Sequence, residues 1–162
     1  QMSLLEDIVM GLERQGIDRL LIVNGHGGND FRQIIRELLP KYNLFICCLD
    51  WFSIVDQNIF EHGGDHANEL ETSLIQYLRP QWVLPLNEAG DGREHVFKIS
   101  GLREGWVWDQ RDWLSATNDT GIGDPSLATP EKGERCMRQV ATKIAEFLID
   151  FSEANLSDLY EK

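Results

Sequence analysis

The sequence predicts an α/β fold in which helices cover a mostly parallel sheet. Two short apolar runs, Arg19–Val23 and Leu44–Leu49, are followed by turn residues, which is typical of buried strands in such a sheet. A helical pattern precedes the first run and another separates the two, and this alternation predicts parallel strands joined by a crossover helix. A chain of 162 residues has the size of one domain, so we expect residues 1–162 to form a single domain.

The first helix is expected to begin near Ser3, because Ser3 and Glu6 have the spacing of a capping box, and Gly16 is placed to end it. A second helix is predicted over 31–39, between the two strands, and Pro40 stops it. The apolar face of the first helix is predicted to contain Leu5, Ile8, Val9 and Leu12.

In the middle of the chain, a loop or short helix is predicted over 51–65, followed by a strong helix from about His66 to Leu78. Pro80 favours an end to that helix at the preceding residue. The apolar piece 82–86 is short and is interrupted by a proline, so we interpret it as an edge strand.

Residues 87–128 are rich in Gly, Asp, Asn and Trp and show little periodicity, which indicates a long functional loop region. The final helix is expected to start at Pro130, with Thr129 as its cap, and to run to about Phe151. The acidic tail beyond Ser152 is expected to be loosely held.

Composition excludes several function classes. The formal net charge of −12 works against binding to nucleic acid or to an anionic membrane, so we expect neither partner. All apolar runs are shorter than the roughly 18 residues of a membrane span. The cysteines are odd in number, and two of them are adjacent in an apolar strand, which favours unpaired thiols and a cytoplasmic location; they are Cys47, Cys48 and Cys136.

The loop Asn24–Asn29 is the most informative segment, because it lies between a predicted strand and a predicted helix. Ligands of open α/β sheets collect at the carboxyl ends of the strands. Three glycines allow a tight turn and a close approach to a ligand, and His26 is the one side chain in the loop suited to binding a metal or moving a proton. Two interpretations stay open for His26: a ligand or catalytic group, and a hydrogen-bonded turn histidine.

A second group of polar residues follows at His66–Ser73. His66 and Glu71 do not share a helical face, so they can converge only if His66 precedes the helix. A solvated helix acid is the alternative interpretation of both Glu69 and Glu71, and for Glu69 it is preferred to a functional group.

Several binding motifs are missing. The glycine loop lacks the last glycine of a dinucleotide fingerprint, no phosphate-binding Gly-Lys-Ser/Thr follows it, and no Gly-x-Ser-x-Gly motif of serine hydrolases occurs. Metal chemistry remains, and a catalytic zinc site normally has three protein ligands. His26 is one candidate ligand and Glu71 is a plausible second, while a third is not evident.

Three motifs follow one another along the chain: Leu21–Asn29, His66–Ala67 with Glu71–Ser73, and Gly123–Thr129 with Glu131–Gly133. In this order and spacing they resemble the creatininase (creatinine amidohydrolase) family. The resemblance implies a three-layer α/β/α fold and a divalent-metal site for zinc or manganese that often holds two ions. It also implies hydrolysis of a non-peptide amide or lactam in a small-molecule substrate, with a metal-activated water as nucleophile, and commonly a homohexamer.

The resemblance also assigns roles to single residues. It implies that His26 binds metal, that His66 handles the proton during ring opening, and that Trp51 lies near the substrate. Creatininase proper has a glutamate ligand two residues after its loop histidine, where this chain has Gly28, so creatinine is a doubtful substrate and Glu71 is expected to supply the missing carboxylate. Substrate contacts are expected from Gly27, Gly28 and Asp65.

The family's first strands carry a Glu-x-His-Gly motif and a following Asp, and neither precedes Gln1. We therefore expect this chain to be the carboxy-terminal part of a larger domain, with the amino-terminal part removed or on a separate chain. The 162 residues alone are expected to bind metal weakly and to be inactive. The alternative is a non-catalytic α/β module for ligand binding or oligomer assembly.

Overall fold

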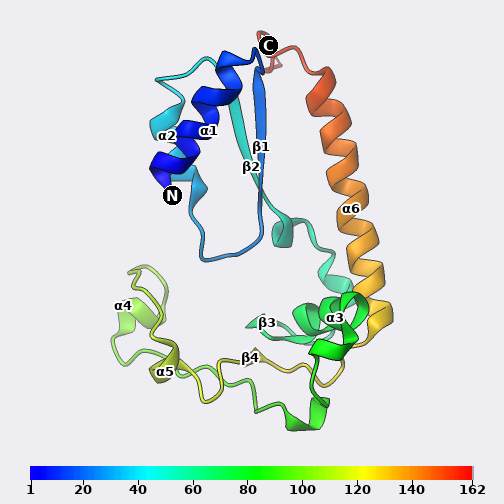
Figure 1. The fold of residues 1–162 in the computed structure, drawn as a ribbon. Helices are drawn as coiled ribbons and strands as arrows, with labels where there is room; N and C mark the ends of the chain where they lie inside the picture. The colour runs from blue at the N-terminus through cyan, green and yellow to red at the C-terminus, as the bar shows by residue number, and fades with distance from the viewer. Residues whose placement is uncertain (162) are drawn as a thin grey trace. The chain divides into compact units, whose positions relative to one another are not determined.

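The computed structural model describes residues 1–161, and the chain divides into two compact units. The first unit contains Gln1–Val55 together with the chain from Lys143 onward, and the second contains Asp56–Thr142. Figure 1 shows the course of the chain through both units. The prediction that residues 1–162 form one domain, as the carboxy-terminal part of a larger one, stays a prediction.

The first unit is built on a parallel pair of strands. β1 (Arg19–Asn24) and β2 (Phe45–Asp50) pair in register from Arg19 opposite Phe45 to Asn24 opposite Asp50. α2 (Phe31–Leu38) forms the crossover between them. Both predicted strands and their parallel pairing are confirmed, because buried apolar runs of this length leave the chain few alternatives.

Helices cover both faces of this sheet (Figure 1). α1 (Met2–Arg14) and α2 share a buried cluster with Leu44 and with Ile46 of β2. Because side chains alternate along a strand, Phe45 points to the opposite face, and its ring lies 5.7 Å from that of Phe151 near the end of α6 (Pro130–Glu153). The helix, sheet, helix order of an α/β fold is therefore present in this unit.

The predicted capping box of the first helix is wrong. α1 begins at Met2, so Gln1 takes the N-cap position and Ser3 lies inside the helix. A residue with helical backbone cannot use its hydroxyl as an N-cap, which needs an extended backbone. The helix ends as predicted, with Gly16 at a φ of +75° two residues after Arg14.

The second unit contains an antiparallel pair of short strands that the sequence did not predict. β3 (Gly64–His66) pairs with β4 (Ile122–Gly123), with Gly64 opposite Gly123 and His66 opposite Ile122. A Cβ atom at Gly64 would lie 2.4 Å from the carbonyl oxygen of Ile122, and the φ of Gly64 is +148°. Glycine is therefore required for the two backbones to approach this closely.

α3 (Glu69–Leu78) begins three residues later than predicted, because His66 belongs to β3 and Asn68 is the N-cap. The side chain of Asn68 accepts a 3.0 Å hydrogen bond from the backbone N–H of Glu71. This polar cap fixes the start of the helix at Glu69, although the apolar pattern suggested an earlier start.

Residues 82–86 are not an edge strand, and that prediction is wrong. Single 3-10 turns cover Pro80–Trp82 and Leu86–Glu88, since the prolines favour turns over a ladder. The region 87–128 is irregular as expected, with two short helices, α4 (Ser100–Arg103) and α5 (Trp113–Ala116).

α6 begins where predicted, and the Thr129 hydroxyl caps it by accepting a bond from the N–H of Lys132. Two further 3-10 turns, Trp51–Ile54 and Gln57–Ile59, follow β2. Within residues 1–161, none of the helices combines the length and the apolar character needed to cross a membrane.

Candidate active-site residues

The loop after β1 is fixed by a buried asparagine. Asn24 is 2% exposed, and its Oδ1 accepts hydrogen bonds from the backbone N–H of His26 and from the amide group of Asn29, both at 3.1 Å. Its own amide group donates to Asp50 at 2.8 Å, at the end of the neighbouring strand. Paired polar residues at the ends of adjacent parallel strands are the signal that could have identified Asn24 and Asp50 from sequence.

His26 is exposed and carries a local hydrogen bond. The backbone N–H of Gly28 donates to its Nδ1 at 2.9 Å. A neutral imidazole that accepts at Nδ1 holds its proton on Nε2. A metal bound at Nε2 would need the proton to move to Nδ1, which would break the contact with Gly28.

The predicted site residues of the first unit lie together at one end of its sheet. Trp51 directly follows β2, and its Nε1 donates to the carbonyl of Gly25 at 3.4 Å. Because β1 and β2 are parallel and in register, Trp51 and the loop of His26, Gly27 and Gly28 share the carboxyl edge. This is the edge at which α/β sheets bind ligands.

His66 and Glu71 converge, as expected if His66 precedes the helix. The Nδ1 of His66 lies 3.7 Å from a carboxylate oxygen of Glu71, and the same oxygen accepts a 2.7 Å bond from the N–H of Ala67. Ala67 has a φ of +50°, a left-handed conformation that is uncommon for a residue with a Cβ. The turn at Ala67 brings the histidine at the end of β3 back toward the first turn of α3.

Glu69 is not a solvated helix acid, so that interpretation is wrong. Its side chain is fully buried and accepts bonds from the backbone N–H groups of Glu61 and His62 at 2.9 and 2.7 Å, and Lys132 of α6 pairs with it. Burial alone would raise the pKa of Glu69, but the hydrogen bonds from Lys132 and the two backbone amides outweigh it and lower that pKa. The partners are distant in sequence, which is why the pattern of α3 did not reveal them.

Asp65, a predicted substrate contact, is bound by a residue of the 87–128 region. Arg111 donates to Asp65 at 2.6 Å and also pairs with Glu94 at 3.2 Å. The guanidinium of Arg111 lies 4.8 Å from the ring centre of Trp113, and the Trp113 and His66 rings are 5.0 Å apart. Sequence reasoning missed Arg111 and Trp113, whose Arg-Asp-Trp motif was the available signal.

A second imidazole–carboxylate contact lies in the same unit. The Nδ1 of His62 is 3.3 Å from the carboxylate of Asp124. Hydrogen bonds from Ser126 lower the pKa of Asp124, and His62 adds a smaller effect in the same direction. Asp124 belongs to the third motif of the sequence, which is thereby placed beside the segment that leads into β3.

The described residues include no group of three or more His, Cys, Asp and Glu side chains arranged to hold a metal ion. His26 offers one exposed imidazole at the carboxyl edge of the β1–β2 sheet. Glu71 is engaged by Ala67 and lies beside His66. The roles of His26 and Glu71 as metal ligands stay predictions.

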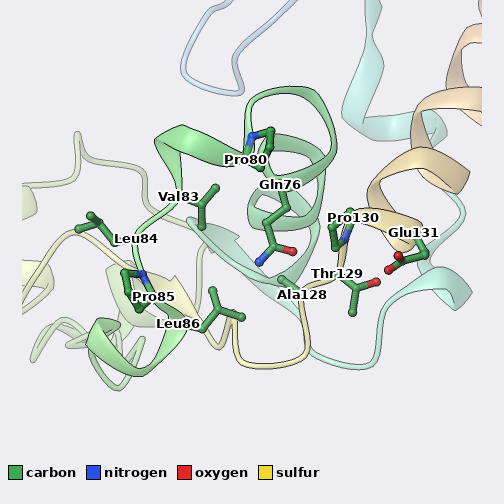
Figure 2. A pocket seen from close by; sticks show the side chains of 10 residues that line it. All are labelled: Gln76, Pro80, Val83, Leu84, Pro85, Leu86, Ala128, Thr129, Pro130 and Glu131. Atoms are coloured by element: carbon green, nitrogen blue, oxygen red, sulfur yellow. The ribbon is translucent and has the colours of Figure 1, made fainter.

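The second unit also contains a mainly apolar cavity, which is separate from these polar groups. It has a volume of about 610 Å³ and lies between the end of α3 and the start of α6 (Figure 2). The predicted site residues lie elsewhere, since the cavity is lined by Gln76, Pro80, Val83, Leu84, Pro85, Leu86, Ala128, Thr129, Pro130 and Glu131.

Comparison with known proteins identifies relatives. A mycofactocin precursor peptide peptidase from Mycobacterium ulcerans (strain Agy99) is 31% identical over an alignment of 128 residues, and the match covers 76% of this chain and 45% of that protein. The crystal structure of a provisionally assigned creatinine amidohydrolase from Bacteroides fragilis NCTC 9343 has a TM-score of 0.87 at 41% identity, covering 99% of this chain and 63% of that one. This chain therefore spans about half to two thirds of the length of these relatives.

Creatininase itself has the same fold. A point mutant described as the Zn-Zn type has a TM-score of 0.71 at 22% identity, and a form described as Mn has a TM-score of 0.62 at 21% identity. Both matches cover 94% of this chain and 64% of creatininase, and they confirm the predicted α/β fold. The family profile described as Creatininase, creatinine amidohydrolase, matches residues 1–148, so this chain belongs to the creatininase family.

Proposed function

We propose that this chain is part of a metal-dependent hydrolase that cleaves a C–N bond, an amide or lactam, in a small molecule. The observation that carries the proposal is the contact between His66 and Glu71, 3.7 Å apart, at the turn between β3 and α3. An imidazole beside a carboxylate is the usual arrangement for a side chain that takes up and releases a proton near neutral pH.

In this proposal His66 transfers a proton to the leaving nitrogen. Glu71 faces Nδ1, which leaves Nε2 as the nitrogen that exchanges a proton with the substrate. Glu71 is held by the N–H of Ala67, so the carboxylate has a fixed position beside Nδ1. Glu71 stays a candidate metal ligand as well, and the Glu71→Gln variant separates the two roles.

The fit of His26 to a metal rests on its exposure and on its place at the carboxyl edge of the β1–β2 sheet. One or two divalent ions, zinc or manganese, would polarise the substrate carbonyl and lower the pKa of a bound water. The Zn-Zn and Mn forms of creatininase support this choice of ions. Ligation through Nε2 would require His26 to exchange its bond with Gly28 for one in which Nδ1 donates.

The class of substrate is the finer part of the proposal. The Bacteroides relative is provisionally assigned as a creatinine amidohydrolase, which supports a non-peptide amide. The Mycobacterium relative is described as a peptide peptidase, which supports a peptide-derived amide as a competing substrate. We propose that Trp51, Gly27, Gly28 and Asp65 contact the substrate; Asp65 would do so while paired with Arg111.

The test combines metal analysis with an assay of hydrolysis. The whole protein, including any part of the family domain outside these 162 residues, is purified, loaded with zinc or manganese and incubated with creatinine, a formylated pyrimidine and a peptide amide, and products are measured by mass spectrometry. The 162 residues alone serve as a comparison that is expected to bind metal weakly and to be inactive. His26→Ala should lose bound metal while circular dichroism shows an unchanged fold. His66→Asn should retain metal and lose roughly a hundredfold or more in rate, the usual contribution of a general acid or base.

Two outcomes would overturn the proposal. If His26→Ala binds metal and ligand as the wild type does, the chain is better described as a non-catalytic α/β module. If His66→Asn hydrolyses the substrate at the wild-type rate, another group transfers the proton. Glu71→Gln resolves the role of that carboxylate, because loss of metal supports ligation and retention of metal with a lower rate supports orientation of His66.

We also propose a homo-oligomer, with a hexamer as the specific expectation from the family resemblance, and a cytoplasmic location. The cytoplasmic proposal is supported by three free cysteines, Cys47, Cys48 and Cys136, since unpaired thiols suit a reducing compartment. Light scattering coupled to size-exclusion chromatography measures the oligomer directly, and a monomer at micromolar concentration would contradict it.

A further inference from the structure

His66 lies against a tryptophan from a distant part of the second unit. The ring centres of His66 and Trp113 are 5.0 Å apart and the ring planes are tilted by 54°. We propose that Trp113 is a positioning residue that fixes the orientation of the His66 imidazole. The inference rests on the proposed function, because it concerns the histidine to which that function assigns proton transfer.

Trp113 lies on a short helix that is anchored at both ends. The hydroxyl of Thr117, a residue that is 5% exposed, donates to the carbonyl of Trp113 at 3.0 Å. The N–H of His95 donates to the carbonyl of Ala116 at 2.7 Å. At the start of α5, Asp112 caps the helix by accepting from the N–H of Leu114. The backbone that carries the indole is therefore held in place.

Arg111 connects this tryptophan to the strand that carries His66. Its guanidinium packs 4.8 Å from the centre of the Trp113 ring, and its Nη1 donates to Asp65 at 2.6 Å. Asp65 immediately precedes His66 in β3. Glu94 provides a second carboxylate for the same guanidinium at 3.2 Å. The residues His66, Asp65, Arg111 and Trp113 thus form a closed ring of covalent and non-covalent contacts.

Two contacts on different atoms are needed to define an imidazole plane. Glu71 faces the Nδ1 of His66, but at 3.7 Å this contact is longer than a hydrogen bond, so it leaves the ring free to tilt. The indole of Trp113 packs against the ring and removes that freedom. A fixed ring keeps Nε2 in one direction, which lowers the entropy lost when the proton is transferred.

The first experiment observes His66 without any substrate. Trp113→Leu and Trp113→Phe are compared by NMR with Trp108→Leu, a control in the same region whose side chain is 82% exposed. We expect Trp113→Leu to shift the Cε1–H resonance of His66 more than those of His26 and His62, and to average the side-chain rotamers of His66. Trp113→Phe should retain a single rotamer, and Trp108→Leu should leave His66 unchanged. An unchanged His66 in Trp113→Leu overturns the inference.

Arg111→Met is the second variant, for the case in which Trp113→Leu does not fold. It keeps the indole and removes the cation that holds it, so partial averaging of the His66 rotamers is expected. A His66 signal identical to that of the wild type in Arg111→Met would contradict the closed ring of contacts.

The second experiment is kinetic and uses the substrate identified by the hydrolysis assay. Trp113→Leu should lower kcat by roughly tenfold to a hundredfold with little change in KM, since misplacing a reacting group by about an ångström has an effect of this size. Trp113→Phe should recover most of the loss. A raised KM with an unchanged kcat would overturn the positioning role, since Trp113 would then contact substrate. If the wild type hydrolyses nothing, the proposed function fails, while the NMR comparison still decides the role of Trp113.

Discussion

The buried carboxylate of Glu69, in the first turn of α3, pairs with the amine of Lys132 in the first turn of α6 at 2.5 Å. The same amine donates to the carbonyl of Leu127 and to Glu61. Glu69 also holds the backbone of residues 61 and 62, which lead into the strand of His66. One carboxylate thus connects two helices and the loop before β3.

Removing the Glu69 carboxylate should strongly destabilise the fold. Glu69→Ala leaves the backbone N–H groups of Glu61 and His62 without their acceptor and removes the buried partner of Lys132, and breaking a buried ion pair in this way costs about 3 kcal/mol. Chemical denaturation measures the free energy of unfolding. Glu134→Ala is the control, because its pair with Arg138 is exposed on one helix and should contribute little. Equal effects of the two substitutions would contradict the assigned importance of Glu69.

The lowered pKa of Glu69 also predicts that the folded protein loses stability in acid. Its pKa is lowered in the folded protein from the ordinary value of 4.5, so the unfolded chain binds more protons in this range. The stabilisation is complete above the unfolded pKa and is lost as the pH falls through the folded pKa. Denaturation midpoints measured from about pH 6 downward should therefore decline more steeply for the wild type below about pH 4.5 than for Glu69→Gln, whose amide does not titrate. Parallel profiles would show that another group controls acid unfolding.

Asn24 should govern the order of the His26 loop. Asn24→Ala removes the acceptor shared by the N–H of His26 and the amide of Asn29, and each lost hydrogen bond costs about 0.5–1.5 kcal/mol. Hydrogen exchange of the His26 amide should accelerate along with the loss of stability. The exposed Asn43 provides a control, and Asn43→Ala should leave that exchange rate as it is in the wild type.

Neighbouring glycines of the loop should respond differently to alanine. A Cβ at Gly28 would lie 3.0 Å from the His26 ring, whereas a Cβ at Gly27 would make an ordinary contact of 3.8 Å with Phe52. We expect Gly28→Ala to displace the imidazole and shift its Cε1–H resonance, with a much smaller shift in Gly27→Ala. Similar spectra for both variants would indicate that the Gly28 N–H does not orient His26.

Two helical glycines offer a further comparison. A Cβ at Gly133 would lie 2.0 Å from the backbone oxygen of Ser73, so Gly133→Ala should separate α6 from α3 and lower the melting temperature sharply. At Gly11, in α1, a Cβ would meet no heavy atom of the described residues within 4 Å. Gly11→Ala should therefore stabilise the protein by about 0.5–1 kcal/mol, the difference in helix propensity. Stabilisation by both substitutions would contradict the close helix crossing.

The sequence predicted those elements that a local pattern controls. β1, β2 and α2 follow from apolar runs, periodicity and Pro40, and α6 follows from Thr129 and Pro130 at its start. The convergence of His66 and Glu71 was expected only if His66 preceded the helix, and the structure meets that condition because His66 belongs to β3. Family membership, carried by the glycine-rich loop and two later motifs, is confirmed.

The features that the sequence did not predict depend on residues that are far apart in the chain. β3 has three residues and pairs with two residues of β4, which is too little sequence for a period to be visible. Burial of Glu69 depends on Lys132, and the environment of His66 depends on Trp113. Patterns within one element do not report such contacts, because each side chain alone resembles an ordinary surface residue.

Because of the left-handed turn at Ala67, Glu71 makes two interactions that can be separated by mutation. One oxygen of Glu71 supports the strained backbone by accepting from Ala67, and the same carboxylate supplies the negative charge beside His66. Backbone support needs only a hydrogen-bond acceptor, whereas the influence on the imidazole needs a charge. A glutamine at position 71 can therefore accept the hydrogen bond from Ala67, but it cannot supply the negative charge beside His66. Selection for a stable fold does not by itself explain the glutamate at this position.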